Sequence, residues 1–280
     1  MIKQRIGVVH PGRMGICVAA TVQNSGHDVY WAAEGRSPQS RQRAEKFNLS
    51  DAGTLSALCE TCSVIISVCP PHAAEEVAKK VLAHSFQGVY LDVNAIAPQR
   101  TVRIGQALAA AGVDFVDGGI IGAPARERGM TWLYLSGRQA PEAAAYFSGG
   151  PLETRVIGDE IGRASALKMC YAAYTKGTTA LLCGILATAE VLGVRGELAT
   201  QWSRDWTHFG EQAEQRVRNA TAKAWRFAGE MAEIADTFRE AGLPGDFHAA
   251  AETIYQRLAG FKDAPKTPAL EEILDKLAHP

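Results

Sequence analysis

The chain has no excess of charge of either sign. Its 280 residues include 29 Lys and Arg against 30 Asp and Glu, a formal net charge of -1, and no basic block. Because binding to nucleic acid requires clustered Lys and Arg that neutralise phosphates, we expect no nucleic acid partner. A local basic cluster remains compatible with a small anionic ligand.

A long apolar run is also missing. The longest apolar stretch, about residues 181–194, contains Thr188 and Glu190 and falls short of the roughly 20 apolar residues that span a bilayer. No charged and then apolar leader precedes the first predicted strand. We therefore expect a cytoplasmic protein with no membrane partner.

Cysteine is too sparse for a disulfide framework. Six cysteines in a chain of this length are typical of reduced, mostly buried thiols. Only Cys59 and Cys62 form a close pair, and no second pair or nearby His completes a zinc-binding set. We predict no metal site and interpret the pair as small apolar residues at a helix-to-strand junction.

A strand, a glycine turn and a helix are predicted at the N-terminal end. Residues 6–9 are apolar, and a helical pattern begins near Arg13. In this arrangement, backbone N–H groups at the helix N-terminus bind a dinucleotide pyrophosphate. Gly12 and Gly15 take the second and third positions of a G-x-G-x-x-G fingerprint, whereas His10 replaces the first glycine. The predicted cofactor contacts in this turn are Gly12, Arg13 and Met14.

The end of the second predicted strand, residues 28–33, bears on the choice of cofactor. In dinucleotide-binding folds an acidic residue here bonds the ribose 2′-hydroxyl, whereas arginine accommodates a 2′-phosphate. The chain offers both, with Glu34 followed by Arg36 and Ser37. Two further arginines on the next helix, Arg41 and Arg43, either complete a phosphate clamp or lie on a solvated face. The pattern favours NADP, with NAD as the alternative.

Strands and helices alternate through the first half of the chain. Buried strands are predicted at 64–68, 88–93 and 113–116, the last closed by a turn at Asp117-Gly118-Gly119, and later strands at 131–135 and 154–157. The alternation predicts a parallel α/β sheet of Rossmann type in a domain spanning residues 1–160. Ligands of such sheets lie beyond the carboxyl ends of the strands.

No strand is predicted beyond residue 160. Residues 164–194 are apolar on nearly all sides, which predicts a long buried helix. The remainder is rich in Ala, Glu and Arg. We predict an all-helical domain over residues 161–280.

Four segments follow one another along the first 180 residues. They are Gly7-Val-Val-His-Pro-Gly-Arg-Met-Gly15, Ser67-Val-Cys-Pro-Pro71, Asp92-Val-Asn-Ala-Ile-Ala-Pro98 with Val116-Asp-Gly-Gly-Ile-Ile-Gly122, and Gly162-Arg-Ala-Ser-Ala-Leu-Lys168. In this order they resemble the β-hydroxyacid dehydrogenases, the family containing 6-phosphogluconate dehydrogenase and 3-hydroxyisobutyrate dehydrogenase. The helical tail is similar to the branch with a C-terminal domain of unknown function. The resemblance implies an NAD(P)-dependent dehydrogenase or reductase and a homodimer, with the helical domain serving substrate binding and dimerisation.

The resemblance also assigns roles to individual residues. The implied cofactor contacts, in a loop covering the nicotinamide side and in the next one, are Val68, Cys69, Pro70 and Asn94. The implied substrate contacts are Asn94, Ile121 and Gly122. Ile121 replaces a serine that commonly binds the substrate carboxylate in the family. For Asn94, a simple role as a turn residue at a strand end is the alternative interpretation.

Lys168 is the predicted catalytic acid/base. Hydride transfer requires a group that delivers or removes a proton at the reacting heteroatom. Tyr171 and Thr175 share its helix face at spacings of three and seven and are predicted to contact substrate. The alternative interpretation is that the Lys168 stem packs on the core while its ammonium reaches solvent. Lys176, roughly 80° round the helix at about 100° per residue, is the second candidate.

The sequence therefore predicts an NADP-preferring oxidoreductase that acts on a C–OH/C=O pair of a small molecule. One alternative is reduction of a C=N bond on the same scaffold, for which the altered carboxylate pocket is less of an obstacle. Another is a non-catalytic dinucleotide-binding regulator. That reading follows from His10 and from the loss of an asparagine that the family carries one turn after the lysine.

Overall fold

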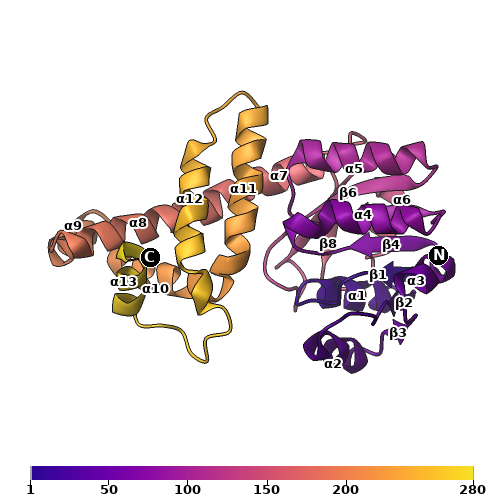
Figure 1. The fold of residues 1–280 in the computed structure, drawn as a ribbon, viewed down its shortest axis with the longest axis horizontal. Coiled ribbons are helices and arrows are strands. Elements are labelled where there is room, and N and C mark those ends of the chain that lie inside the picture. The colour runs from indigo at the N-terminus through magenta and orange to yellow at the C-terminus, as the bar shows by residue number, and fades with distance from the viewer. Residues whose placement is uncertain (1, 280) are drawn as a thin grey trace. The chain divides into compact units, whose positions relative to one another are not determined.

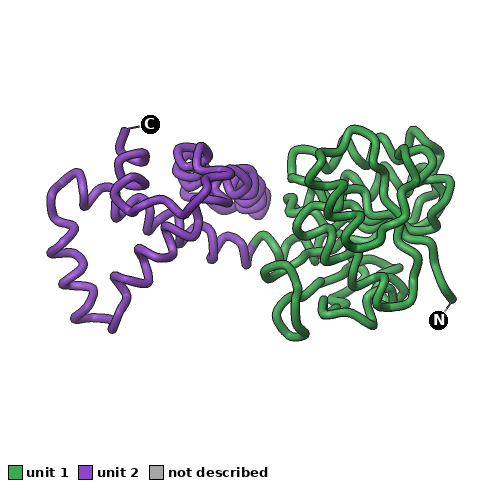
Figure 2. The backbone as a smooth tube through the Cα atoms, turned by 90° about the horizontal axis from the view of Figure 1, so that it is seen from below, with its two compact units in different colours: residues 1–169 green, residues 170–280 purple. Residues whose placement is uncertain are grey.

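The computed structural model describes residues 2–279 and divides into two compact units, residues 1–169 and 170–280 (Figure 2). The division predicted from the sequence lay earlier, at residue 160. The reason for the later boundary is that the helix beginning at Arg163 is anchored to the sheet of the first unit by Asp117.

The first unit is a sheet covered by helices on both faces (Figure 1). Its elements are β1 (Arg5–Val8), α1 (Gly15–Asn24), β2 (Asp28–Trp31), α2 (Pro38–Lys46), β3 (Ser50–Asp51), α3 (Leu55–Thr61), β4 (Val64–Ser67), η1 (Pro71–Ala73), α4 (Ala74–Ala83), β5 (Val89–Asp92), α5 (Pro98–Ala110), β6 (Asp114–Ile121), β7 (Trp132–Ser136), α6 (Ala140–Ala145), β8 (Glu153–Val156) and the start of α7 (Arg163–Ala172).

The strand order is β3-β2-β1-β4-β5-β6-β7-β8. Strands β1 to β6 are parallel, β7 runs antiparallel to β6, and β8 runs parallel to β7. The predicted Rossmann-type fold class is therefore confirmed. The antiparallel step at β7 and the short edge strand β3 were not predicted.

Residues on alternate sides of the strands build two hydrophobic cores. Ile6 and Val8 of β1 belong to a cluster with residues of α1, α2 and α6. Val9, Ile65 and Tyr90 belong to a second cluster with residues of α3, α4 and α5. Burial on both faces explains the nearly continuous apolar runs of these strands.

Strand β6 is longer than the sequence predicted. Its predicted end, a turn at Asp117-Gly118-Gly119, is wrong, because β6 continues to Ile121 and pairs with β7 from Asp117↔Ser136 to Ile121↔Trp132. A Cβ on Gly118 would lie 2.6 Å from Cγ1 of Val93. The glycines therefore allow close packing within a strand rather than a change of direction.

The second unit is all-helical in the part that the structure describes, as predicted. After α7, its elements are η2 (Ala173–Gly177), a π-helical turn, then α8 (Thr178–Val191), α9 (Arg195–Asp205), α10 (Phe209–Ala220), η3 (Thr221–Lys223), α11 (Ala224–Glu240), α12 (Asp246–Arg257), η4 (Ala259–Phe261) and α13 (Leu270–Ala278). Helices α11 and α12 pack side by side (Figure 1). Over residues 2–279, none of the helices combines the length and the apolar character that a bilayer span requires.

The predicted single buried helix over residues 164–194 is wrong in two respects. The π-helical turn η2 interrupts it between α7 and α8. Several large apolar side chains also stay exposed within the chain, Tyr174 by 70%, Leu181 by 47% and Leu192 by 68%. One side of α8 is buried by its own unit, and the other carries an apolar surface.

Candidate functional site

The carboxyl ends of β1 and β4 lie at the point where the strand order reverses. In doubly wound sheets, ligands bind in the crevice at this point. The loops that follow β1, β2, β4 and β5 carry all the predicted cofactor residues. The topology thus brings four segments that are distant in sequence to one edge of the sheet.

The turn between β1 and α1 has the geometry of a pyrophosphate cradle. A Cβ on Gly15 would overlap the carbonyl oxygen of His10, so the helix approaches the loop backbone as closely as a glycine permits. A Cβ on Gly12 would meet nothing within 4 Å. No side chain caps the helix at Met14. Open space beside an uncapped helix N-terminus fits a bound dinucleotide phosphate.

Two buried side-chain nitrogens in the same region lack a hydrogen-bond partner in residues 2–279. They are Nδ1 of His10 and Nε of Arg36. Burial, and then the charges of Arg36 and Lys80, lower the pKa of His10 to about 4. The imidazole is therefore neutral at physiological pH. Because an unsatisfied buried polar group costs about 1–3 kcal/mol, these nitrogens favour a polar ligand here.

The predicted residues in the loop after β2 and in helix α2 make different contacts. Glu34 is exposed, and its N–H donates to the Gly53 carbonyl at 2.9 Å. Ser37 caps α2 and accepts a hydrogen bond from the N–H of Ser40 at 3.3 Å. Arg41 donates to the Ala33 carbonyl at 2.7 Å. Ser37 and Arg41 thus make structural contacts here, while the Arg36 guanidinium retains a buried donor for a ligand. The cofactor contacts of Glu34, Arg36 and Ser37 stay predictions.

Asn94 joins the loops after β4 and β5. Its Oδ1 accepts the N–H of Cys69 at 2.5 Å, and its Nδ2 donates to Ser67 Oγ and to Asp92 Oδ2, both at 3.0 Å. Asn94 is 3% exposed. Val68, Cys69 and Pro70 of the covering loop are half-buried. Asn94 is thus a cross-strand clamp in this structure, and its direct contacts to cofactor and substrate remain predictions.

A row of four buried polar side chains crosses the sheet beneath these loops. In the strand register Ser67 pairs with Asp92, Asp92 with Asp117, and Asp117 with Ser136. All four are at most 2% exposed. The sequence analysis did not predict this row. The available signal was that each of the four polar residues ends or interrupts an apolar strand at an equivalent place.

Asp117 anchors the helix that carries Lys168. Its carboxylate accepts the N–H groups of residues 162, 164 and 165 at 2.9–3.1 Å. The hydroxyls of Ser165 and Ser136 donate to it at 2.6 and 3.0 Å. Burial raises the pKa of Asp117, while these donors oppose that shift. A carboxylate at a helix N-terminus also interacts favourably with the helix dipole.

Lys168 lies directly on β6. A Cβ on Gly119 would be 2.6 Å from the Ala164 carbonyl oxygen and 3.1 Å from Cβ of Lys168. Gly119 and Asn94 each lie two residues beyond the paired residues Asp117 and Asp92. The lysine is therefore held at the same rim of the sheet as the loop that contains Asn94.

Lys176, the second candidate, is engaged elsewhere. Its ammonium forms an ion pair with Glu230, and the two side chains are 11% and 6% exposed. The ammonium also lies 5.1 Å from the ring centroid of Phe227, and Tyr255 donates to the Lys176 carbonyl at 2.8 Å. These partners indicate a structural role for Lys176 at the π-helical turn. The acid/base role of Lys168 stays a prediction.

The predicted substrate contacts fall in both units. In the first unit, Ile121 is half-buried at the end of β6, and Gly122 is exposed with φ +126. In the second unit, Tyr171 is 47% exposed, and Thr175 donates to its carbonyl oxygen at 3.2 Å. Their roles toward a substrate remain predictions.

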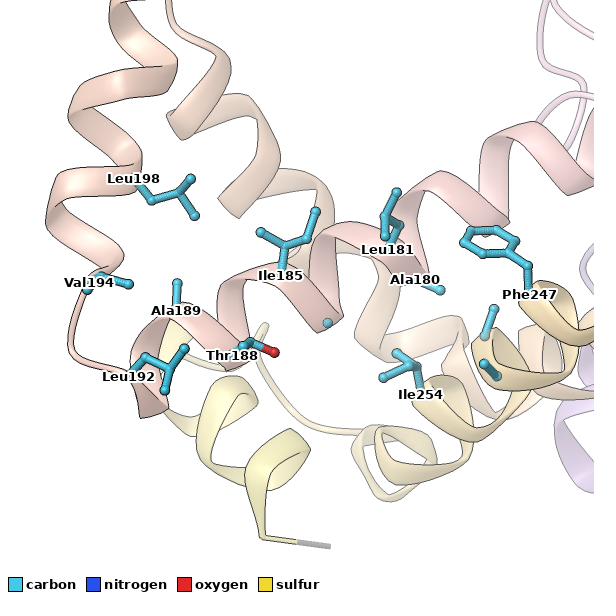
Figure 3. Close-up of a pocket in the computed structure, with 13 residues that line it drawn as sticks. Ala180, Leu181, Ile185, Thr188, Ala189, Leu192, Val194, Leu198, Phe247 and Ile254 are labelled. Atoms are coloured by element: carbon cyan, nitrogen blue, oxygen red, sulfur yellow. The ribbon is translucent and has the colours of Figure 1, made fainter.

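The second unit has a separate apolar pocket of about 490 Å³ between α8, the start of α9 and α12 (Figure 3). Figure 3 shows Leu181, Ile185 and Leu192 of the α8 region along it, with Phe247 and Ile254 from α12. It contains none of the predicted site residues. Its lining offers a binding surface for apolar groups rather than chemistry.

The cysteine pair lies at the end of α3, where the chain turns into β4. Both thiols are free and buried. Burial raises the pKa of Cys59 to about 11 and that of Cys62 to about 12. They are therefore protonated, poorly reactive thiols at neutral pH.

Two families match the chain. The NAD binding domain of 6-phosphogluconate dehydrogenase matches residues 5–144, and a domain of unknown function, DUF1932, matches residues 189–258. An uncharacterized 28.5 kDa protein from Methanothermus fervidus is 32% identical over 172 residues, which cover 61% of this chain and 65% of that relative. The match thus spans less than two thirds of the relative's length.

Solved structures share the fold over nearly the whole chain. A conserved protein of unknown function, described as structurally similar to 3-hydroxyacid dehydrogenases, is 28% identical with a TM-score of 0.67 over 91% of this chain and 97% of that one. Mycobacterium tuberculosis 3-hydroxyisobutyrate dehydrogenase with L-serine has a TM-score of 0.70 at 14% identity over 99% of both chains. A reductive aminase from Aspergillus terreus, solved with NADPH and ethyl levulinate, has a TM-score of 0.57 at 16% identity, over 98% of this chain and 99% of that one.

The two glycines of the turn provide a test of the cradle. We expect Gly15→Ala to lower the free energy of unfolding by about 2 kcal/mol, because the added methyl overlaps backbone. Gly12→Ala is expected to leave stability within about 0.5 kcal/mol and to weaken NADPH binding about tenfold, because the methyl takes space beside the phosphate. Urea unfolding and fluorescence titration measure both. A Gly12→Ala protein that binds NADPH as tightly as wild type would contradict the cradle.

Proposed function

The chain belongs to the family of the NAD binding domain of 6-phosphogluconate dehydrogenase, and from this premise we propose that it is an NADP-preferring oxidoreductase. It has the NAD(P)-binding scaffold of the 3-hydroxyacid dehydrogenases. The proposed reaction is hydride transfer between the nicotinamide and a carbon that carries oxygen or nitrogen. Lys168 is the proposed acid/base.

The observation that carries the proposal is the anchoring of Lys168 at the cofactor rim of the sheet. Asp117 holds the first turn of α7, and Gly119 lets Cβ of Lys168 approach β6. When bound, a nicotinamide dinucleotide supplies or accepts the hydride. Lys168 Nζ then gives or takes the proton at the substrate heteroatom, so that both transfers occur at one edge of the sheet.

Two substitutions test the acid/base assignment. We expect Lys168→Ala to lower turnover about 100-fold or more, because the proton donor is lost, with NADPH affinity changed by less than about threefold. Lys168→Arg keeps the positive charge but stays protonated at all working pH values, so it should be as slow. Oxidation of NADPH with a panel of aldehydes, ketones, 3-oxoacids and imines gives the measurement. Full turnover by either variant would refute the role.

A C=N substrate is the second candidate. Ile121 cannot donate a hydrogen bond to a substrate carboxylate, which disfavours a small hydroxyacid bound through that group. An imine has no such requirement, and the reductive aminase shares the fold. The imine arm of the panel separates the two classes. NADPH binding without turnover on any member would instead support a dinucleotide-binding regulator.

Arg36 supports the preference for NADP. Its guanidinium has a buried Nε without a partner in the described part of the chain, close to the β1 turn. A 2′-phosphate would supply acceptor oxygens for this donor. Glu34 is exposed in the same loop. The competing arrangement is one in which Glu34 accepts a hydrogen bond from the ribose 2′-hydroxyl of NAD.

The preference can be measured with one matched pair. Arg36→Ala is expected to weaken NADPH binding at least about tenfold, because a charge-assisted hydrogen bond is worth about 1.5–3 kcal/mol, and to leave NADH binding nearly unchanged. Arg138→Ala is the control, because Arg138 is exposed and follows β7, which runs antiparallel to β6 and so ends at the opposite edge of the sheet. It removes an equal charge and should change neither affinity. Parallel titrations with NADPH and NADH decide the matter. Equal losses for both dinucleotides in Arg36→Ala would argue against a 2′-phosphate contact.

The proposed partner is a second copy of this chain. Leu181, Ile185, Thr188 and Leu192 recur at spacings of four, three and four on the exposed side of α8 and line the apolar pocket of the second unit. Such spacing is the pattern of helix pairing. An exposed apolar surface of this kind supports the proposed contact with a second copy.

Light scattering tests the dimer. The monomer mass is 30.0 kDa, so we expect a species of about 60 kDa, as closed dimers are the commonest homo-oligomers. The double variant Leu181→Arg and Leu192→Arg should return to the monomer mass, because charges cannot be buried in an apolar contact. Leu243→Arg, which is exposed outside the pocket, is the control. A wild-type monomer at micromolar concentration would exclude the dimer.

A further inference from the structure

Within the described part of the chain, the carboxylate of Asp92 accepts hydrogen bonds from one residue, Asn94. Its Oδ1 accepts the Asn94 N–H at 2.9 Å and its Oδ2 accepts from Asn94 Nδ2 at 3.0 Å. The carboxyl group is 2% exposed at the end of β5. Through its other atoms, Asn94 holds the N–H of Cys69 and the hydroxyl of Ser67. A chain of contacts therefore runs from a buried carboxylate to the backbone of the loop after β4.

We propose that Asp92 is a positioning residue that acts through Asn94: its ionised carboxylate orients the Asn94 amide, and the amide fixes the Cys69 backbone at the edge of the cofactor site. This inference rests on the proposed function, because the loop that begins at Cys69 is there taken to border the bound dinucleotide. Asp92 itself has no direct contact with cofactor or substrate in this scheme.

The neighbouring carboxyl group explains why Asp92 is sensitive to pH. Asp92 and Asp117 pair in the register of β5 and β6 and so lie on the same side of the sheet. Asp117 has five donors from α7, its preceding loop and β7. Within residues 2–279, the hydrogen-bond donors to Asp92 are the two of Asn94. Two adjacent buried carboxyl groups with unequal donors titrate at different pH.

Burial raises the pKa of Asp92 to about 7, with a smaller contribution from Asp117 in the same direction. The bonds from Asn94 and the charge of Arg100 on α5 oppose this shift. Burial also raises the pKa of the Cys69 thiol to about 12 and that of the Tyr90 phenol well above its usual value. Asp92 therefore changes its charge near neutral pH, whereas the Cys69 thiol and the Tyr90 phenol stay neutral there.

Protonation removes one of the two acceptors that Asn94 requires. A protonated carboxyl carries a hydrogen on one oxygen, and that oxygen then faces either the N–H or the Nδ2 of Asn94, both of which are donors. Asn94 loses a hydrogen bond and no longer holds the Cys69 N–H in place. The clamp is therefore complete above pH 7 and is lost as the pH falls through that value.

The test compares NADPH affinity in wild type and Asp92→Asn from pH 5.5 to 8.5. The variant side chain has the shape and hydrogen-bonding groups of the protonated carboxyl, so it should bind like wild type at pH 5.5. At pH 8.5 we expect wild type to bind NADPH at least about threefold more tightly than the variant does. This difference in affinity corresponds to part of the free energy of one hydrogen bond. The 2′-phosphate titrates equally for both proteins, so the ratio of their affinities is the readout.

Asp114→Asn is the matched control, because Asp114 is an exposed carboxylate at the start of β6. It should follow wild type at every pH. A ratio of NADPH affinities between wild type and Asp92→Asn that stays constant from pH 5.5 to 8.5 would overturn the proposal. So would a wild-type profile reproduced in full by the variant.

Hydrogen exchange of the segment containing Cys69, in the protein without cofactor, separates this inference from the proposed function. We expect slower exchange in wild type than in Asp92→Asn at pH 8.5 and equal exchange at pH 5.5. If Asp92→Asn does not fold, Asn94→Ala takes its place and should exchange fast throughout. Failure to bind any dinucleotide would refute the proposed function alone. Equal exchange at pH 8.5 would refute the role of Asp92.

Discussion

The buried carboxylate of Asp117 is the contact on which the arrangement of the first unit depends. It satisfies three backbone N–H groups around the start of α7 and two serine hydroxyls, one from β7 and one from α7. Removing a charge from water is costly unless such donors surround it. Their convergence therefore fixes β6, β7 and α7 in one geometry. This geometry places Lys168 of α7 against Gly119 of β6.

The same constraint separates the two carboxyl groups of the polar row. Asp117 has enough donors to support a negative charge, and Asp92 beside it has two donors from one residue. The row from Ser67 to Ser136 thus places a well-supported charge next to a weakly supported one. Asp117 stabilises the packing of α7 on the sheet, and Asp92 contacts the loops after β4 and β5 through Asn94. Polar residues at equivalent ends of adjacent strands provide this division without any irregular backbone.

Sequence patterns identified most of the elements at the cofactor edge, because local features determine them. Gly15 at the start of α1 and the loop after β2 follow directly from strand and cap signals. The Asp117-Gly118-Gly119 segment was misread as a turn, since its residue types favour turns in isolation. Its strand conformation depends on β7, which lies beyond a long loop. Likewise, the break at Ala173–Gly177 follows no glycine or proline signal at its start.

The sequence by itself indicated most of the strands and helices and the loops that reach the cofactor edge, because these depend on short-range periodicity and on glycine positions. It indicated the family through the resemblance of four segments to the β-hydroxyacid dehydrogenases. Only the tertiary structure decided which lysine is held at that edge and which is paired with Glu230. It also decided that Asn94 is a clamp rather than a simple turn residue. Hydrogen bonds between residues 25 to 48 positions apart depend on strand register and burial, and neither is written in the local sequence.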